Sequence, residues 1–104
     1  MAVQNERFRS FEEVTQTTVA VSTVAADVTN GKPFHLTVQN IGTQAVWMRV
    51  GATAATTGTN YSYILAGGAA DNDGTGAMID ISGYTGTISF ITASGTSNVV
   101  VSQG

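Results

Sequence analysis

Hydrophobic and polar residues alternate with a period of two along most of this 104-residue chain, from Thr15 onward. Such alternation is typical of β-strands that bury one face. Turn signals follow one another at spacings of about ten residues, which is the pattern of a sandwich or barrel of short strands. We expect seven strands, over residues 15–24, 34–39, 45–50, 61–65, 77–81, 87–93 and 98–102.

The larger apolar members of these runs define the expected core, because alternate side chains of a strand point to the same face of its sheet. The expected inward positions are Val19, Val21, Phe34, Leu36, Val38, Val46, Met48, Val50, Ile79, Ile81, Val99 and Val101, and Tyr61, Tyr63 and Leu65 alternate in the same way.

Glycine-containing turns and polar loops separate the strands. Asn30 and Gly31 both tolerate positive φ and stand before Lys32-Pro33, which is a strong turn signal. Segments 52–60 and 66–76 hold mostly small or polar residues and are expected to be surface loops. The predicted fold is all-β, a single-domain antiparallel β-sandwich or jelly-roll-like barrel of about seven to eight short strands spanning residues 14–104.

Residues 1–13 differ from everything downstream. They hold five of the eleven charged residues, interleaved with Phe8 and Phe11. Ser10 and Glu13 fit a helix capping box, which allows a short helical turn. One interpretation is a frayed terminus, and the other is an arm whose Phe8, Arg9 and Phe11 dock on a partner.

Trp47 and Arg49 fall on the strand face opposite Val46, Met48 and Val50. On that outward face they could stack as a cation and an aromatic ring, or anchor an interface, because Trp and Arg are enriched at binding hot spots. A register slipped by one residue would instead place Trp47 in the core. The sequence leaves both the outward and the core placement of Trp47 open.

Composition and charge narrow the classes of function. Val, Ile and Thr supply 34 of the 104 residues, whereas Leu occurs twice and Lys once, which favours strands over helices. A formal net charge of −3, with four dispersed basic residues, argues against direct nucleic-acid binding. No cysteine is present to form a disulfide framework or a thiolate metal site. No stretch has the length of a transmembrane segment, and we expect no signal peptide and no membrane association.

Candidate chemistry is sparse, and we expect neither an enzyme nor a cofactor. His35, the single histidine, lies on an outward strand face without an orienting acid or further metal ligands nearby in sequence. Asp71 and Asp73 could offer oxygen ligands to Ca²⁺, but the closing acidic residue of an EF-hand loop is absent. The alternative is a polar turn whose Asp and Asn side chains bond their own backbone. No catalytic and no metal-binding residue is therefore predicted.

Several strand and turn runs resemble the small virion proteins of tailed bacteriophages, of the capsid decoration or cement type. The runs that carry the resemblance are LTVQNIGTQAVWMRVG at 36–51, LAGG at 65–68, IDI at 79–81, YTGTI at 84–88, SGT at 94–96 and VVV at 99–101. Decoration proteins of this type include jelly rolls and β-sandwiches that sit on the outer capsid as dimers or trimers. They share a manner of packing and no set of functional side chains.

The resemblance implies a structural virion protein, made in the host cytoplasm, that binds the major capsid protein and copies of itself as a homodimer or homotrimer. The candidate contacts are Phe8, Arg9, Phe11, Trp47 and Arg49. The alternative is a tail fibre, spike or other receptor-binding module that recognises glycans through Tyr61, Tyr63, Tyr84 or Trp47.

Overall fold

The computed structural model describes residues 15–32, 34–54 and 60–104, and in these ranges the chain forms strands and no helix. No helix in them is therefore long and apolar enough to cross a membrane. The strands are β1 (Thr15–Val21), β2 (Ala26–Asn30), β3 (Leu36–Asn40), β4 (Val46–Val50), β5 (Tyr63–Leu65), β6 (Met78–Ile81), β7 (Gly86–Thr92) and β8 (Ser97–Gln103). The predicted all-β class is confirmed.

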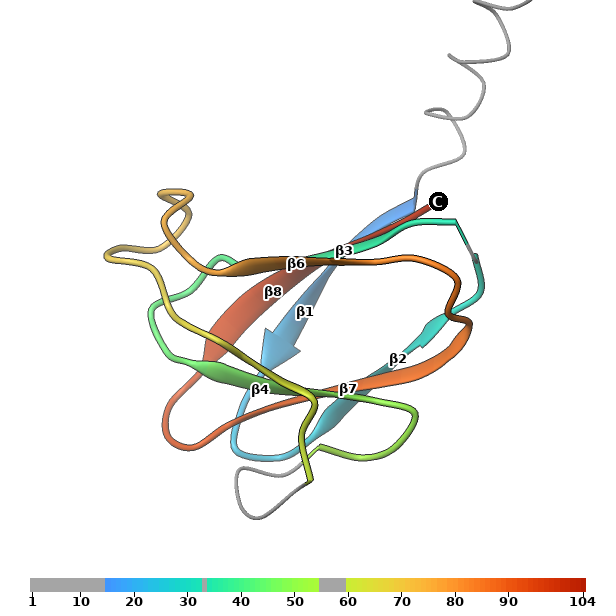
Figure 1. Ribbon diagram of the computed structural model, residues 1–104. Helices are drawn as coiled ribbons and strands as arrows, with labels where there is room; N and C mark the ends of the chain where they lie inside the picture. The colour runs from blue at the N-terminus through green and yellow to red at the C-terminus, as the bar shows by residue number, and fades with distance from the viewer. Residues whose placement is uncertain (1–14, 33, 55–59) are drawn as a thin grey trace, which may run out of the picture.

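The strands form two antiparallel four-stranded sheets that face each other (Figure 1). One sheet has the order β1-β8-β3-β6 and is called the first sheet below, and the second sheet has the order β2-β7-β4-β5. Eight strands in this order, with the first beside the last, are the double Greek key of a jelly roll. Of the two predicted architectures, the topology therefore selects the jelly roll.

The core lies between the two sheets and is filled by alternate residues of their inner faces. Phe90 is its largest fully buried side chain. The predicted inward positions of β3, β4 and β8 are confirmed, because Leu36, Val38, Val46, Met48, Val99 and Val101 are all buried. Val50, Ile79 and Ile81 are partly buried and pack against this cluster.

Phe34 is a correction to the sequence prediction, because its side chain is 74% exposed instead of buried. The strand begins only at Leu36. The backbone N–H groups of Phe34 and His35 both donate to the carbonyl oxygen of Gly104, at 3.1 and 3.0 Å. These two bonds fix the backbone ahead of β3 beside the end of the chain, and the Phe34 side chain stays outside the core.

The structure also corrects the first and fourth expected strands. β1 ends at Val21, and Val24, which was placed in the same strand, lies in the following turn and is 75% exposed. The chain then forms β2, which the sequence pattern did not predict. In the run from Tyr61 to Leu65 only Leu65 is buried, and Tyr63 lies exposed on the short edge strand β5.

Candidate functional site

Asn40 organises one end of the jelly roll. Its side chain is fully buried at the end of β3, and its amide nitrogen donates to the carbonyl oxygens of Gln44 (2.7 Å) and Leu65 (3.0 Å). Its amide oxygen accepts from the N–H of Gly42 (3.1 Å) and the hydroxyl of Ser97 (2.7 Å). Every hydrogen-bonding position of the amide is used, so one side chain joins the β3–β4 turn to β5 and β8.

Close backbone contacts reinforce this end. A Cβ atom added at Gly76 would lie 1.8 Å from the carbonyl oxygen of Asn40, and one added at Gly67 would lie 2.1 Å from that of Thr43. Only glycine leaves room for such an approach. Across this close contact the N–H groups of Gly68 and Asn72 donate to the carbonyl oxygens of Gly42 and Ile41, each at 2.8 Å. The loop 66–76 is thereby packed against the β3–β4 turn.

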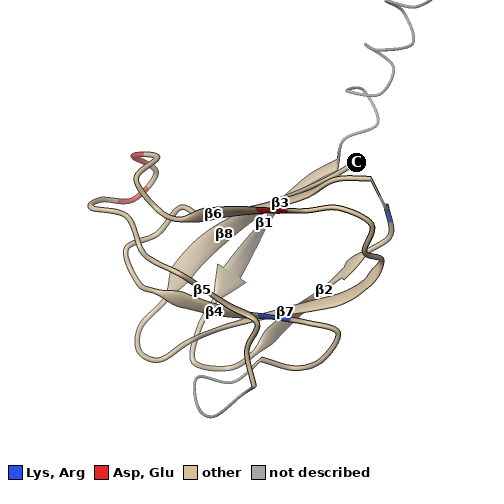
Figure 2. Cartoon of the chain, viewed as in Figure 1, with Lys and Arg blue, Asp and Glu red and all other residues tan. Residues whose placement is uncertain are grey.

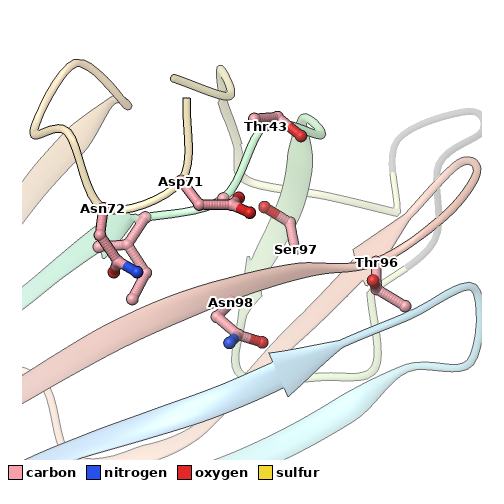
Figure 3. Close-up of a pocket in the computed structure, with 8 residues that line it drawn as sticks. Thr43, Asp71, Asn72, Thr96, Ser97 and Asn98 are labelled. Atoms are coloured by element: carbon pink, nitrogen blue, oxygen red, sulfur yellow. The ribbon is translucent and has the colours of Figure 1, made fainter. Parts of the chain in front are cut away.

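A polar hollow of about 340 Å³ opens beside this junction (Figure 3). Its wall is contributed by the β3–β4 turn, the loop 66–76 and the start of β8. The polar side chains labelled in the close-up are those of Thr43, Asp71, Asn72, Thr96, Ser97 and Asn98. These are hydroxyl, amide and carboxylate groups, which can hydrogen-bond a polar ligand but form no nucleophile and base pair.

The carboxylate of Asp73, beside this hollow, is engaged by its own loop. It accepts from the hydroxyl of Thr75 at 2.6 Å, the N–H of Thr75 at 2.9 Å and the N–H of Ala70 at 3.0 Å. The hydroxyl of Thr75 in turn accepts from the N–H of Ala69 at 2.8 Å. This geometry is that of the self-bonded polar turn. Among the described residues no three His, Cys, Asp or Glu side chains gather as a metal site would require.

We expect the loop 66–76 to lose stability in acid through Asp73. Hydrogen bonds from the Thr75 hydroxyl, then from the Thr75 and Ala70 N–H groups, hold the pKa of this carboxyl below its ordinary value of 3.8. A lowered folded-state pKa stabilises the fold above the unfolded value, and this contribution is lost as the pH falls through the folded-state pKa. The acid-induced fall in melting temperature below about pH 4 should therefore be shallower in Asp73→Asn than in the wild type.

The matched control for this prediction is Asp71→Asn, which removes the other carboxylate of the loop. Asp71 makes no side-chain hydrogen bond within the described residues, so its replacement should leave the slope of melting temperature against pH nearer to that of the wild type. Equal slopes for Asp73→Asn and the wild type would contradict the assignment.

A second feature lies on the outer face of the second sheet, where apolar side chains form a row across three strands. Trp47 on β4 is in register with Ile64 on β5 and with Ile91 on β7. Its neighbours Val46 and Met48 are fully buried, so Trp47 points away from the core and the slipped register is excluded. Ile64 is 50% exposed, and Trp47 and Ile91 are partly exposed. We call Ile64, Trp47 and Ile91 the apolar row.

Arg49 is also on this outer face, but its guanidinium group holds the loop that follows β4. Its Nη1 donates to the carbonyl oxygen of Thr53 at 3.2 Å and to Oδ1 of Asn60 at 3.5 Å. The N–H of Ala54 donates to the Ser89 hydroxyl at 2.9 Å, which brings the same loop across the sheet. Arg49 therefore has a local structural role that the sequence pattern did not indicate, and it lies within β4 beside the apolar row.

The remaining candidates lie apart from these features. Phe8, Arg9 and Phe11 are outside the described residues. The hydroxyl of Tyr84 donates to the carbonyl oxygen of Thr87 at 2.8 Å, and its ring packs against the core, so Tyr84 is not a free aromatic platform. His35 is exposed. The apolar residues that sequence reasoning missed, Ile64 and Ile91, become recognisable only from the strand register.

Comparison with protein-family models, with curated proteins and with solved structures gives no match.

Proposed function

We propose that this protein is a structural virion protein that binds and stabilises a bacteriophage capsid from its outer surface, as a homo-oligomeric decoration or cement protein. The observation that supports the proposal most directly is the apolar row of Ile64, Trp47 and Ile91 on the outside of a small jelly roll. Exposed apolar surface centred on a tryptophan is typical of protein interfaces. A compact jelly roll is a suitable scaffold for presenting it, and viral capsid domains use the same fold.

The partner in this proposal is the major capsid protein, together with further copies of the chain. The apolar row and residues 1–13, with Phe8, Arg9 and Phe11, are the candidate contact regions. Attachment by such a surface is non-covalent and involves neither a cofactor nor a reaction. The tightly packed junction around Asn40 supports this role, because a clamp on a shell benefits from a body that holds its shape.

A receptor-binding module of a tail fibre or spike is the second candidate. The polar hollow lined by Asp71, Asn72 and Asn98 favours it, because carboxylate and amide groups are suited to the hydroxyl groups of a glycan. The two candidates differ in copy number. Quantitative mass spectrometry of purified particles should find the chain at a stoichiometry near that of the shell protein if it is a decoration protein. A handful of copies confined to the tail would overturn the proposal and favour the second candidate.

Deletion of residues 1–13 should weaken attachment to capsids at least tenfold while the jelly roll stays folded. The segment concentrates charge and two phenylalanines ahead of β1, so its loss should remove interface contacts and few core contacts. A tenfold loss of affinity corresponds to about 1.4 kcal/mol. The measurement is co-sedimentation of the full chain and of the truncated chain with capsids that lack the protein, with far-UV circular dichroism and melting temperature as checks of folding.

The matched control is Phe34→Ala, which removes an exposed phenylalanine that is not part of the segment 1–13. This variant should bind capsids as the full chain does. If the truncated protein stays folded and binds with unchanged affinity, residues 1–13 are not the contact region, and the apolar row is the remaining candidate. If it unfolds, the segment belongs to the folded domain.

A further inference from the structure

The free edge of β1 is the longest unpaired strand edge of the described molecule. Among the described strands, β8 is the only hydrogen-bonded neighbour of β1. Residues 15–18 are all exposed. Thr15 and Thr17 belong to the same face as the buried Val21, yet both are open to solvent. The first half of β1 is therefore not covered by the opposite sheet.

The other three sheet edges carry features that discourage pairing with another chain. β5 has only three residues. β6 has four, including Asp80, whose carboxylate accepts a hydrogen bond from the hydroxyl of Thr37 at 2.6 Å. β2 has five residues and carries the exposed Asp27. Short length and charge are the usual means by which proteins protect sheet edges.

β1 lacks each of these features. Its sequence, TQTTVAV, spans seven residues without a charge, a proline or a glycine, and five of the seven are β-branched. In Figure 2 the strand is free of charged residues along its whole length. A long, uncharged, β-branched edge is a template for a further strand, since its outward N–H and C=O groups have no partner in the sheet. The edge therefore fits a protein partner that adds a strand.

We propose that two copies of this chain pair β1 with β1 in antiparallel orientation, about a two-fold axis that passes through Thr18 perpendicular to the sheet. This register uses all seven residues of each strand. It sets Thr18 opposite the partner's Thr18, Thr17 opposite the partner's Val19, and Thr15 opposite the partner's Val21. The two first sheets then form one continuous sheet of eight strands across the dimer.

A second copy fits this edge because β1 carries no charge and because pairing keeps the core-facing side chains of both copies on one side. Self-pairing normally sets like charges against each other, but β1 carries none. A two-fold axis perpendicular to the sheet keeps the core-facing residues of both copies on the same side, so the exposed Thr15 and Thr17 gain cover beside the partner's Val21 and the partner's Val19. This dimer is the form of self-association that the proposed function calls for. Its formation does not depend on which partner the dimer binds.

The test is a charge exchange at Thr18, an exposed outward-facing residue whose replacement leaves the core intact. In sedimentation experiments on the full chain at micromolar concentration, the wild type should form dimers. Thr18→Lys and Thr18→Glu should each weaken dimerisation about tenfold, because each sets two like charges opposite one another on the axis. An equimolar mixture of the two variants should recover the dimer, and rising salt concentration should reduce that recovery.

The control is Thr29→Lys, which places the same charge at an exposed position of a different edge strand, β2, and should leave the dimer unchanged. Hydrogen exchange of the wild type gives an independent readout, since backbone amides in Thr15–Val21 should become more protected as protein concentration rises. The inference would be overturned if the wild type is monomeric or trimeric, or if a mixture of the two Thr18 variants does not recover the dimer. It would also be overturned if hydrogen exchange in β1 does not depend on protein concentration. None of these measurements involves capsids, so failure here is distinct from failure of the proposed function.

Discussion

Replacement of Asn40 by Ala should lower the free energy of unfolding by about 4 kcal/mol, because each buried polar group left without a partner costs about 1–3 kcal/mol. The substitution removes four hydrogen bonds at once, those to Gln44, Leu65, Gly42 and Ser97. The carbonyl oxygen of Leu65 loses its amide donor in a buried position, and that of Gln44 loses its donor in a partly buried one. Urea denaturation followed by circular dichroism measures the change.

Asn98→Ala is the matched control for Asn40, because it removes the same side chain at an exposed position near the same end of the barrel. It should change stability by less than about 0.5 kcal/mol. Similar losses for the two variants would show that the Asn40 network contributes nothing particular. Asn40→Asp should resemble Asn40→Ala, since a carboxylate would face the two carbonyl oxygens with no hydrogen to donate.

Leu36→Ala should destabilise the protein by about 3 kcal/mol, whereas Phe34→Ala should cost less than about 0.5 kcal/mol. Leu36 is buried in the core on β3, and its removal leaves a cavity between the sheets. Phe34, two residues earlier in the chain, is largely exposed. Thermal or urea unfolding of the two variants measures the contrast. Comparable losses would mean that Phe34 belongs to the core after all.

The strands that could be predicted from the sequence are those with an unbroken alternation of apolar residues. In β4 the run from Val46 to Val50 predicts both the strand and which of its side chains point inward, and Val99 and Val101 do the same for β8. β2 could not be found in this way, since Ala26–Asn30 has one large apolar residue, Val28, and turns the polar Asn30 inward. The period-two rule needs apolar side chains on the buried face, and β2 supplies too few.

Phe34 shows the opposite failure. It continues the alternation of Leu36 and Val38, but the backbone ahead of β3 is held by Gly104, which is 70 residues away in sequence. A local pattern contains no information about such a contact. The choice between sandwich and jelly roll depended on long-range pairing in the same way, because it follows from β8 lying between β1 and β3.

The candidate site was partly accessible from the sequence. The outward placement of Trp47 was one of two interpretations that the sequence left open, and the structure shows that Trp47 points outward. Its neighbours Ile64 and Ile91 could not be assigned, because register between strands distant in sequence is not encoded locally. The sequence pattern did not single out Asn40. Its importance comes from Leu65 and Ser97, which only the folded chain brings to it.

The position of β8 between β1 and β3 has a consequence for the order of events during synthesis. Neither β1 nor β3 has another antiparallel partner that would join the two, so the first sheet stays in two parts until Ser97–Gln103 is available. Translation adds about 5–20 residues per second, and pairing between strands so far apart in sequence is slow. On the ribosome the uncharged β1 segment therefore remains unpaired for several seconds before β8 has been synthesised. A chaperone would protect the chain from aggregation during this interval.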